Sequence, residues 1–253
     1  MSSSSSKAAA RAQKAAEMRA VQEKREARRR ILTILGVVVA MIAIVGGAIL
    51  IGKIQTDKEQ DELEAGIPAI GKSDYGLVIG EEDAPHSVII YEDFLCPYCG
   101  QLEAATRDNL AELAAEGKVR VEYRPFDLLS QMIETDYPIR AANAFAVVRD
   151  TAGDEAAKEF HDLLFERQPT EGDEDSYLTD DELVALAVEA GATEADVRGG
   201  IEGLDQEGWV DGATAEARES GVSGTPTVFV DGEVFQTGGG VDGLARGIIG
   251  AVD

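Results

Sequence analysis

The sequence predicts an α/β fold with an inserted helical subdomain, preceded by a single transmembrane helix. Three observations lead to this class. An apolar, β-branched run at residues 88–91, a helical pattern at 97–115 and an alternating run at 119–123 form a strand–helix–strand unit. Residues 132–218 show helical patterns without a strand-like run. Residues 31–51 are uncharged and almost wholly apolar, which is typical of a membrane span.

Charge is distributed unevenly along the chain. The 253 residues carry a formal charge of −25. Residues 1–30 carry +6, so the rest of the chain carries −31. An acidic body of this kind stays soluble through self-repulsion and is not expected to bind nucleic acid. We interpret the acidity as a solvated surface rather than as a dedicated site for cationic partners.

The N-terminal region predicts a membrane anchor. Residues 1–30 form a basic, serine-rich tail, and the apolar run that follows has 21 residues, enough to span a hydrocarbon core of about 30 Å. A cleaved signal peptide is the competing interpretation. The long basic region, the long apolar core and the lack of a clear small-x-small cleavage site favour an uncleaved anchor at 31–52. The flanking Lys and Arg residues keep the N-terminus in the cytoplasm. The linker 53–73 and a domain at 74–253 are therefore expected outside the cell membrane.

The first part of this domain predicts a small sheet. Residues 76–80 predict a short edge strand, and residues 88–91 predict a buried central strand. The helix at 97–115 begins with Pro97, which is tolerated there because its missing N–H would be unpaired anyway. The alternating run at 119–123 predicts a second strand parallel to the first, which completes a βαβ unit.

The middle of the domain predicts a helical insertion at about 130–218. Residues 139–149 are rich in alanine, and residues 155–166 carry phenylalanine and leucine at helical spacing. Thr179 and Glu182 have the Thr-x-x-Glu spacing of a helix start. Residues 209–219 predict the last helix of the insertion.

The C-terminal part predicts a hairpin and a closing helix. Residues 227–230 predict a strand, Asp231-Gly232 a two-residue turn, and residues 233–236 the return strand. Three glycines break the chain before a short helix at 244–252.

Both cysteines, Cys96 and Cys99, lie directly after the predicted central strand and at the start of a helix. This is the layout of a thiol–disulfide redox site. The free N–H groups and the positive end of the helix dipole favour a thiolate at the helix start, so we expect Cys96 to be the nucleophile and Cys99 the resolving thiol. Tyr98 lies between the two cysteines in the sequence. We expect it to modify the oxidising strength of the disulfide by packing and through its hydroxyl. A structural disulfide and a pair of buried free thiols are the alternatives, but so tight a loop gains little stability from a bridge.

The sequence does not predict a metal or cofactor site. A single C-x-x-C pair supplies half of a four-thiolate zinc site, and no nearby residues complete it. A site built from the two cysteines, His86 and His161 is a weaker alternative, because the histidines are far apart in the sequence.

The Cys-Pro-Tyr-Cys motif and the Gly-Thr-Pro-Thr-Val-Phe-Val-Asp-Gly stretch at 224–232 together resemble thioredoxin-fold proteins of the DsbA type. The resemblance covers about residues 70–253 and is greatest to single-pass, membrane-anchored members from bacteria with one cell membrane. Asp93-Phe94 and the stretch at 160–165 are also similar to this family. The resemblance implies a thioredoxin-like fold, a protein dithiol:disulfide oxidoreductase, and a cis Thr225-Pro226 bond beside the cysteines that supports substrate binding.

The sequence departs from the family at one position. Relatives commonly carry a buried acid six residues before the first cysteine, as the proton acceptor for the resolving thiol, and this chain has Ile90 there. We expect Glu92, Asp93 or water to handle the proton instead.

The function that follows is a membrane-anchored, extracytoplasmic oxidase that introduces disulfides into exported proteins. Its expected partners are reduced exported polypeptides and, as the resemblance implies, a quinone-linked membrane reoxidant of the DsbB or vitamin-K-epoxide-reductase type. A reductase or isomerase of the same fold is the first alternative, because Pro-Tyr is also the dipeptide of glutaredoxins. A non-catalytic peptide-binding chaperone module is the second.

Overall fold

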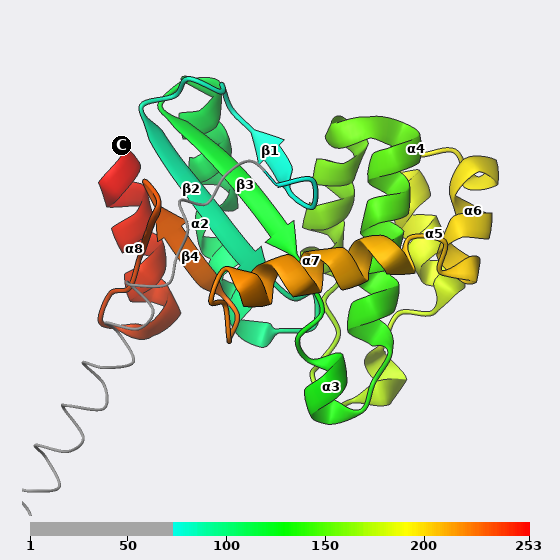
Figure 1. Ribbon diagram of the computed structural model, residues 1–253. Coiled ribbons are helices and arrows are strands. Elements are labelled where there is room, and N and C mark those ends of the chain that lie inside the picture. Colours follow the sequence, from blue (N-terminus) through cyan, green and yellow to red (C-terminus); the bar gives the residue numbers. More distant parts are fainter. Residues whose placement is uncertain (1–72) are drawn as a thin grey trace, which may run out of the picture. The chain divides into compact units, whose positions relative to one another are not determined.

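The structure, a computed structural model, describes residues 73–253. This part of the chain is a mixed β-sheet with helices on both faces and a helical subdomain beside it (Figure 1). The predicted basic tail 1–30 and membrane anchor 31–52 lie outside the described residues, as does the linker up to residue 72. Within 73–253, no helix combines the length and the apolar character that crossing a membrane requires.

The sheet has five strands in the order β1-β3-β2-β4-β5. Strand β2 is central, as predicted, and pairs in parallel with β3 and antiparallel with β4. The two edge strands β1 and β5 pair antiparallel with β3 and β4. The strands span Leu77–Ile79 (β1), His86–Glu92 (β2), Val119–Pro125 (β3), Thr227–Val230 (β4) and Glu233–Val234 (β5).

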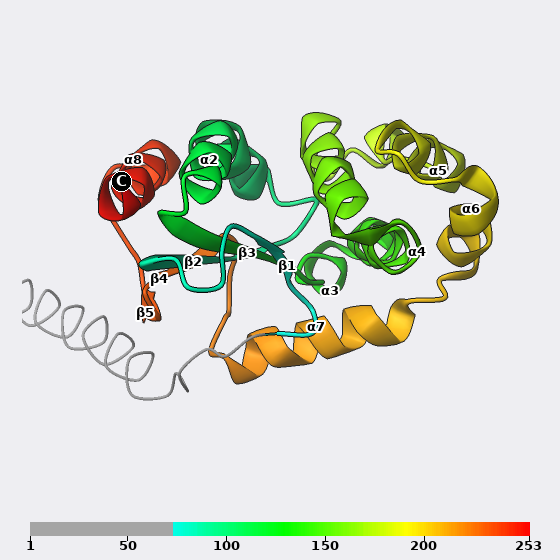
Figure 2. The same ribbon diagram turned by 90° about the horizontal axis from the view of Figure 1, so that it is seen from above.

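The predicted βαβ unit is confirmed. Helix α2 (Pro97–Ala115) connects β2 to β3, and the parallel register places Val88 opposite Val121. Both valines are fully buried. Helix α8 (Gly240–Val252) lies beside α2 on the same face of the sheet (Figure 2).

The opposite face of the sheet is covered by α7 (Glu207–Glu219) (Figure 2). This helix buries polar residues of β3 that strand alternation would leave in solvent. Glu122 is fully buried and accepts hydrogen bonds from Arg124, with 2.8 Å between Arg124 Nε and Glu122 Oε1. Arg124 also bonds to Tyr91 at 2.7 Å and to Glu216 of α7 at 3.2 Å. A buried ion pair of this kind is tolerated because each charge is hydrogen-bonded.

The helices of the predicted insertion follow β3. They span Ser130–Ile133 (α3), Tyr137–Glu166 (α4), Asp180–Glu189 (α5) and Glu194–Gly203 (α6), with a 3₁₀ turn at Glu174–Ser176 (η1) before α5, and α7 completes the set. The predicted helical runs at 139–149 and 155–166 are two segments of α4, separated at Gly153, whose φ of 86° interrupts the helix.

Two predicted boundaries at the C-terminal end need correction. The turn at Asp231-Gly232 has positive φ at both residues, as a two-residue hairpin of this kind requires. Its return strand ends at Val234 rather than at residue 236, and α8 starts at Gly240 rather than at residue 244. Gly239, with a φ of 97°, lets the chain turn directly into the helix.

Candidate active site

Cys96 is the N-cap residue of α2, four residues after the end of β2. Its extended backbone (φ −69°, ψ 116°) lets its carbonyl oxygen accept hydrogen bonds from the amides of Cys99 and Gly100, at 3.0 and 3.2 Å. The Cys96 amide donates to the carbonyl oxygen of Asp93 at 3.0 Å. The sulfur of Cys96 therefore lies at the N-terminus of a 19-residue helix, where unpaired N–H groups favour negative charge.

The two thiols, both reduced, have opposite ionisation behaviour. A hydrogen bond from the Cys99 side chain, followed by contributions from Thr225 and the first-turn amides, lowers the pKa of Cys96 to about 6 against the opposing effect of burial. Burial raises the pKa of Cys99 well above its ordinary value, and the neighbouring Cys96 adds to the effect. Near neutral pH, Cys96 is thus a thiolate and Cys99 a thiol.

The predicted loop at 225–226 lies against Cys96. The Thr225-Pro226 peptide bond is cis, and the Sγ of Cys96 is hydrogen-bonded to the carbonyl oxygen of Thr225 at 3.4 Å. Tyr98, which is 58 % exposed, and Pro226 line a groove of about 430 Å³ beside the site. The groove continues along Val234 and Phe235, so it offers an apolar surface to a polypeptide.

Asp93 holds the two loops around the site together. Its buried carboxylate accepts hydrogen bonds from the amides of Leu95, Leu128 and Leu129, at 2.8, 2.9 and 2.9 Å. Burial nevertheless raises the pKa of Asp93 to about 6. These bonds join the turn before Cys96 to the segment that follows β3.

Gln168 connects the helical insertion to the cysteines. It follows α4, and its Nε2 donates to the carbonyl oxygens of Phe94 and Cys96, both at 2.9 Å. Its amide packs against Gly100, where a Cβ would lie 2.2 Å from the Gln168 oxygen. Nothing in the sequence pattern indicated this residue, because a glutamine after a helix is usually solvated.

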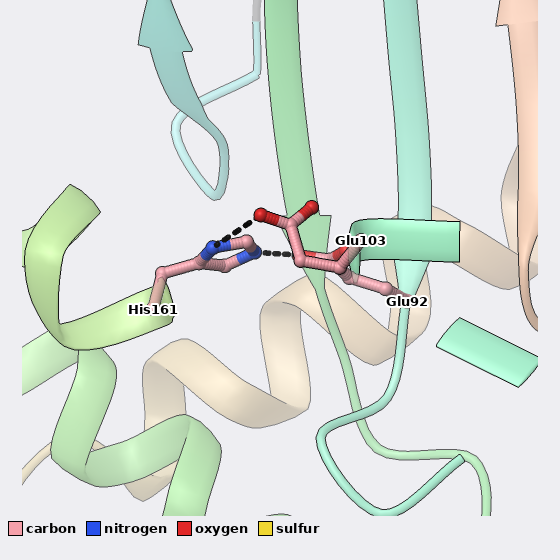
Figure 3. A group of neighbouring side chains, drawn as sticks. All are labelled: Glu92, Glu103 and His161. Atoms are coloured by element: carbon pink, nitrogen blue, oxygen red, sulfur yellow. Dashed lines mark hydrogen bonds and ion pairs between the residues drawn. The ribbon is translucent and has the colours of Figure 1, made fainter. Parts of the chain in front are cut away.

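A second cluster of buried polar residues is formed by side chains of β2, α2 and α4 (Figure 3). It consists of Glu92 at the end of β2, Glu103 on α2 and His161 on α4, each at most 3 % exposed. The Nε2 of His161 lies 2.5 Å from Glu92 Oε1, and its Nδ1 lies 3.9 Å from Glu103 Oε1. The same Nδ1 lies 3.0 Å from the Oδ1 of Asp162.

His161 is held in its charged form. Burial opposes the charge, but the field of Glu92, the hydrogen bonds to Asp162 and Glu92, and the field of Glu103 outweigh it and raise the pKa of His161 to about 10. The side chain of His161 is fully buried. Glu103 was missed. The sequence feature that could have indicated Glu103 is a carboxylate at a position on the buried face of α2. Cys99 and Leu102 lie on the same face.

The donor set of this cluster favours ion pairs over a metal ion. The three side chains bring donor atoms within 4.8 Å of one another. The Nε2 of His161 already lies at hydrogen-bond distance from Glu92 Oε1, and the Nζ of Lys158 lies 3.9 Å from Glu103 Oε1. A metal ion bound there would be repelled by the imidazolium of His161 and the ammonium group of Lys158. Of the residues in the alternative site, His86 lies at the start of β2, at the end of the strand away from Cys96, and is bonded to Asp231 at 2.9 Å.

Comparison with known proteins agrees with this geometry. The family model for thioredoxin matches residues 72–248. The reduced disulfide bond oxidoreductase DsbG from Mycobacterium tuberculosis is 28 % identical, with a TM-score of 0.57 over 68 % of this chain and 92 % of that chain. MdbA, a thiol-disulfide oxidoreductase from Actinomyces oris, is 25 % identical, with a TM-score of 0.55 over 68 % of this chain and 84 % of that chain.

A curated relative is much longer than this chain. The Na(+)/H(+) antiporter NhaA 1 from Salinispora arenicola is 34 % identical over 177 residues, which are 69 % of this chain and 24 % of the antiporter. The chain thus spans about a quarter of the length of the curated relatives it matches.

Proposed function

The chain belongs to the thioredoxin family as a DsbA-like thiol–disulfide oxidoreductase, and we propose that it introduces disulfides into exported polypeptides through Cys96 and Cys99. The observation that carries the proposal is the contrast between a thiol of lowered pKa at Cys96 and a buried thiol of raised pKa at Cys99. A stabilised Cys96 thiolate stabilises the reduced form, which makes the Cys96–Cys99 disulfide a stronger oxidant.

The reaction begins with the oxidised protein. A client thiolate attacks the Sγ of Cys96, the Cys96–Cys99 bond breaks, and the Cys99 thiolate takes up a proton. A second client thiol loses its proton and attacks the client sulfur of the mixed disulfide. The client leaves with a disulfide, and Cys96 leaves as the thiolate that the helix N-terminus stabilises. The client has then lost two electrons, and the cysteine pair has gained them.

The groove beside Cys96 is the proposed client-binding surface. Thr225 and Pro226 lie next to the reactive sulfur, and the apolar lining at Val234 and Phe235 suits an unfolded chain that still exposes hydrophobic side chains. Tyr98 projects from the same surface, where its half-exposed ring can pack on a client.

We also propose that residues 31–52 anchor this domain on the outer side of the cell membrane, because disulfides persist in oxidising compartments. A quinone-linked membrane protein of the DsbB or vitamin-K-epoxide-reductase type would reoxidise the reduced pair. A membrane-impermeant thiol reagent should label Cys96 in intact cells. Labelling that requires lysis of the cells would contradict the orientation.

The activity test uses the full-length protein in its oxidised form and a reduced, unfolded client. Disulfides should form in the client, and Cys96→Ser should abolish their formation. Cys99→Ser cannot form the internal disulfide and should likewise form none in the reduced client. Given a client that already contains a disulfide, its Cys96 thiolate should attack that bond, expel one client thiolate and stay in a mixed disulfide, because the thiol that resolves the bond is missing. A protein that reduces client disulfides but does not form them would favour the reductase or isomerase. Full function of Cys96→Ser in cells would favour the chaperone module.

A further inference from the structure

The exchange chemistry requires a proton partner for Cys99. In the oxidising direction Cys99 is expelled as a thiolate into surroundings that leave it 2 % exposed. An unpaired charge there is costly, and burial, followed by the effects of Cys96 and of the Glu92 carboxylate, raises the pKa of Cys99 well above its ordinary value. The strand position at which relatives carry an acid holds Ile90, which is itself buried. The proton must therefore come from another group.

Glu103 is placed to supply it. It lies four residues after Cys99 on α2, so the two side chains are neighbours on the same face of the helix, with about 5–6 Å between their Cβ atoms. Both are buried. The Oε1 of Glu103 also lies 3.9 Å from the Nδ1 of His161 (Figure 3).

The carboxyl of Glu103 is poised between its two protonation states. Its Oε1 is buried and has no hydrogen-bond partner among residues 73–253. The nearest cations, His161 Nδ1 and Lys158 Nζ, are both 3.9 Å away, too far for a hydrogen bond. Burial raises the pKa of Glu103 to about 7, and the field of His161 limits the rise. A group with a pKa near the working pH both gives and accepts protons readily.

We propose that Glu103 exchanges a proton with Cys99, directly or through one water molecule, and that Glu92 and His161 are positioning residues that hold it in place. This inference rests on the proposed exchange at Cys96 and Cys99. When Cys99 is expelled, the Glu103 carboxyl gives it a proton and becomes a carboxylate. When Cys99 attacks a mixed disulfide on Cys96, its proton passes to the Glu103 carboxylate, and the displaced thiolate leaves.

The cluster also has a route to solvent. Lys158 and Asp162, which lie 2.5 Å apart, line a groove of about 1020 Å³ together with Arg107. The Asp162 carboxylate contacts His161 from this side. Protons can therefore leave and enter through residues that take no part in lining the client groove.

Several charged groups face Glu103 and belong in any account of its pH dependence. His161, Lys158 and Asp162 face it from α4, and Glu92 faces it from β2. Tyr123 of β3 and Arg107 of α2 also lie within its field. Of these, His161 and Lys158 favour the carboxylate, whereas Glu92 and Asp162 favour the protonated carboxyl.

The test separates the two thiols in one reaction. The reduced full-length protein is mixed with a symmetric aromatic disulfide whose thiolate is coloured. The first thiolate is released when Cys96 attacks the reagent. The second is released when Cys99 loses its proton and attacks the mixed disulfide on Cys96. In the wild-type protein, the first release should follow the ionisation of Cys96 near pH 6, and the second should show an additional ionisation near pH 7.

Glu103→Gln should slow the second release by roughly a hundredfold at pH 7, the lower end of what a positioned acid–base group contributes. It should remove the ionisation near pH 7 and leave the first release unchanged. Glu103→Asp should restore part of the second release. Glu112→Gln, an exposed change on the same helix, is the matched control and should alter neither release.

Several results would overturn the inference. One is a second release that is unchanged in Glu103→Gln. Another is a loss of the second release in Glu92→Gln while Glu103→Gln stays normal, which would assign the proton to Glu92. If Glu103→Gln does not fold, the wild-type protein still tests the inference. A second release whose pH dependence shows no ionisation near pH 7 would overturn it. A missing first release would overturn the proposed function, and this inference with it.

Discussion

At the scale of single residues, the site depends on two sulfurs with the same chemistry in different surroundings. Cys96 caps a helix and bonds to the Thr225 loop, whereas Cys99 is enclosed one turn inside. The difference in pKa comes from position alone, since a free cysteine would not distinguish them. This asymmetry decides which sulfur meets the client.

The lowered pKa of Cys96 predicts a pH-dependent stability of the reduced protein. Because the folded pKa of about 6 lies below the ordinary 9.0, ionisation stabilises the folded state. The contribution of Cys96 ionisation to the stability of the folded state is fully present above pH 9. It is lost as the pH falls from 9 towards 6. Urea unfolding of the reduced protein should therefore show stability that rises across this range relative to Cys96→Ala. Parallel curves for the two proteins would contradict the lowered pKa.

Asp93 predicts a second effect at this scale. Asp93→Ala leaves three backbone amides without their acceptor, so the free energy of unfolding should fall by roughly 2–3 kcal/mol. Urea denaturation measures the loss. Asp108→Ala, a change at a side chain that is 96 % exposed, serves as control and should cost no more than about 0.5 kcal/mol. Equal costs for the two variants would show that the Asp93 bonds contribute nothing.

At the scale of elements, the helices of the insertion begin and end through local rules. The predicted helix start at Thr179 is confirmed as a full capping box: its hydroxyl accepts from the Glu182 amide, and the Glu182 carboxylate accepts from the Thr179 amide. Thr193 occupies the same position before α6 but forms no capping hydrogen bond through its side chain.

This difference predicts the effect of the same substitution at both sites. Thr179→Ala should lower the free energy of unfolding by about 1 kcal/mol, because the Glu182 amide in the first turn of α5 loses its acceptor, the Thr179 hydroxyl. Thr193→Ala should lower it by much less. Chemical denaturation of both variants under identical conditions provides the comparison. A larger loss at Thr193 would be inconsistent with the capping geometry.

At the scale of the whole domain, the insertion and the sheet meet at the cysteines. Gln168 after α4 holds the carbonyl of Cys96, and His161 of α4 bonds to Glu92 of β2. Phe94, just before Cys96, packs on Phe165 of α4 with 5.2 Å between ring centroids. The insertion is therefore part of the support of the site.

Removing the Gln168 contact tests this support. Gln168→Ala leaves the Cys96 carbonyl with its two helix amides alone, so the first turn of α2 should open more often. Hydrogen exchange at the amides of Cys99 and Gly100 should become faster. Gln101→Ala, an exposed change on the same helix, should leave both amides as protected as in the wild type. Unchanged exchange in Gln168→Ala would show that the contact carries no stability.

The sequence predicts structural features that depend on residues close together along the chain. The central strand, helix α2 with Cys96 at its start, the hairpin turn at Asp231-Gly232 and the capping box are local patterns, and each is confirmed. Convergence of distant residues could not be predicted in the same way. Glu103 and His161 are 58 positions apart, and each alone is an ordinary polar residue on a helix. Burial by α7 of charged residues on β3 likewise depends on the assembled layers.

The contacts of α4 have a consequence for anyone who would transplant this redox motif onto a minimal scaffold. Along the sequence the helical segment resembles a detachable module between two halves of a smaller protein. A graft that kept the sheet, helix α2 and the cis-proline loop would preserve both sulfurs. It would lose Gln168, which donates a hydrogen bond to the carbonyl of Cys96, and His161, which pairs with Glu92. Such a miniature would keep the motif and lose the contacts through which the insertion supports it.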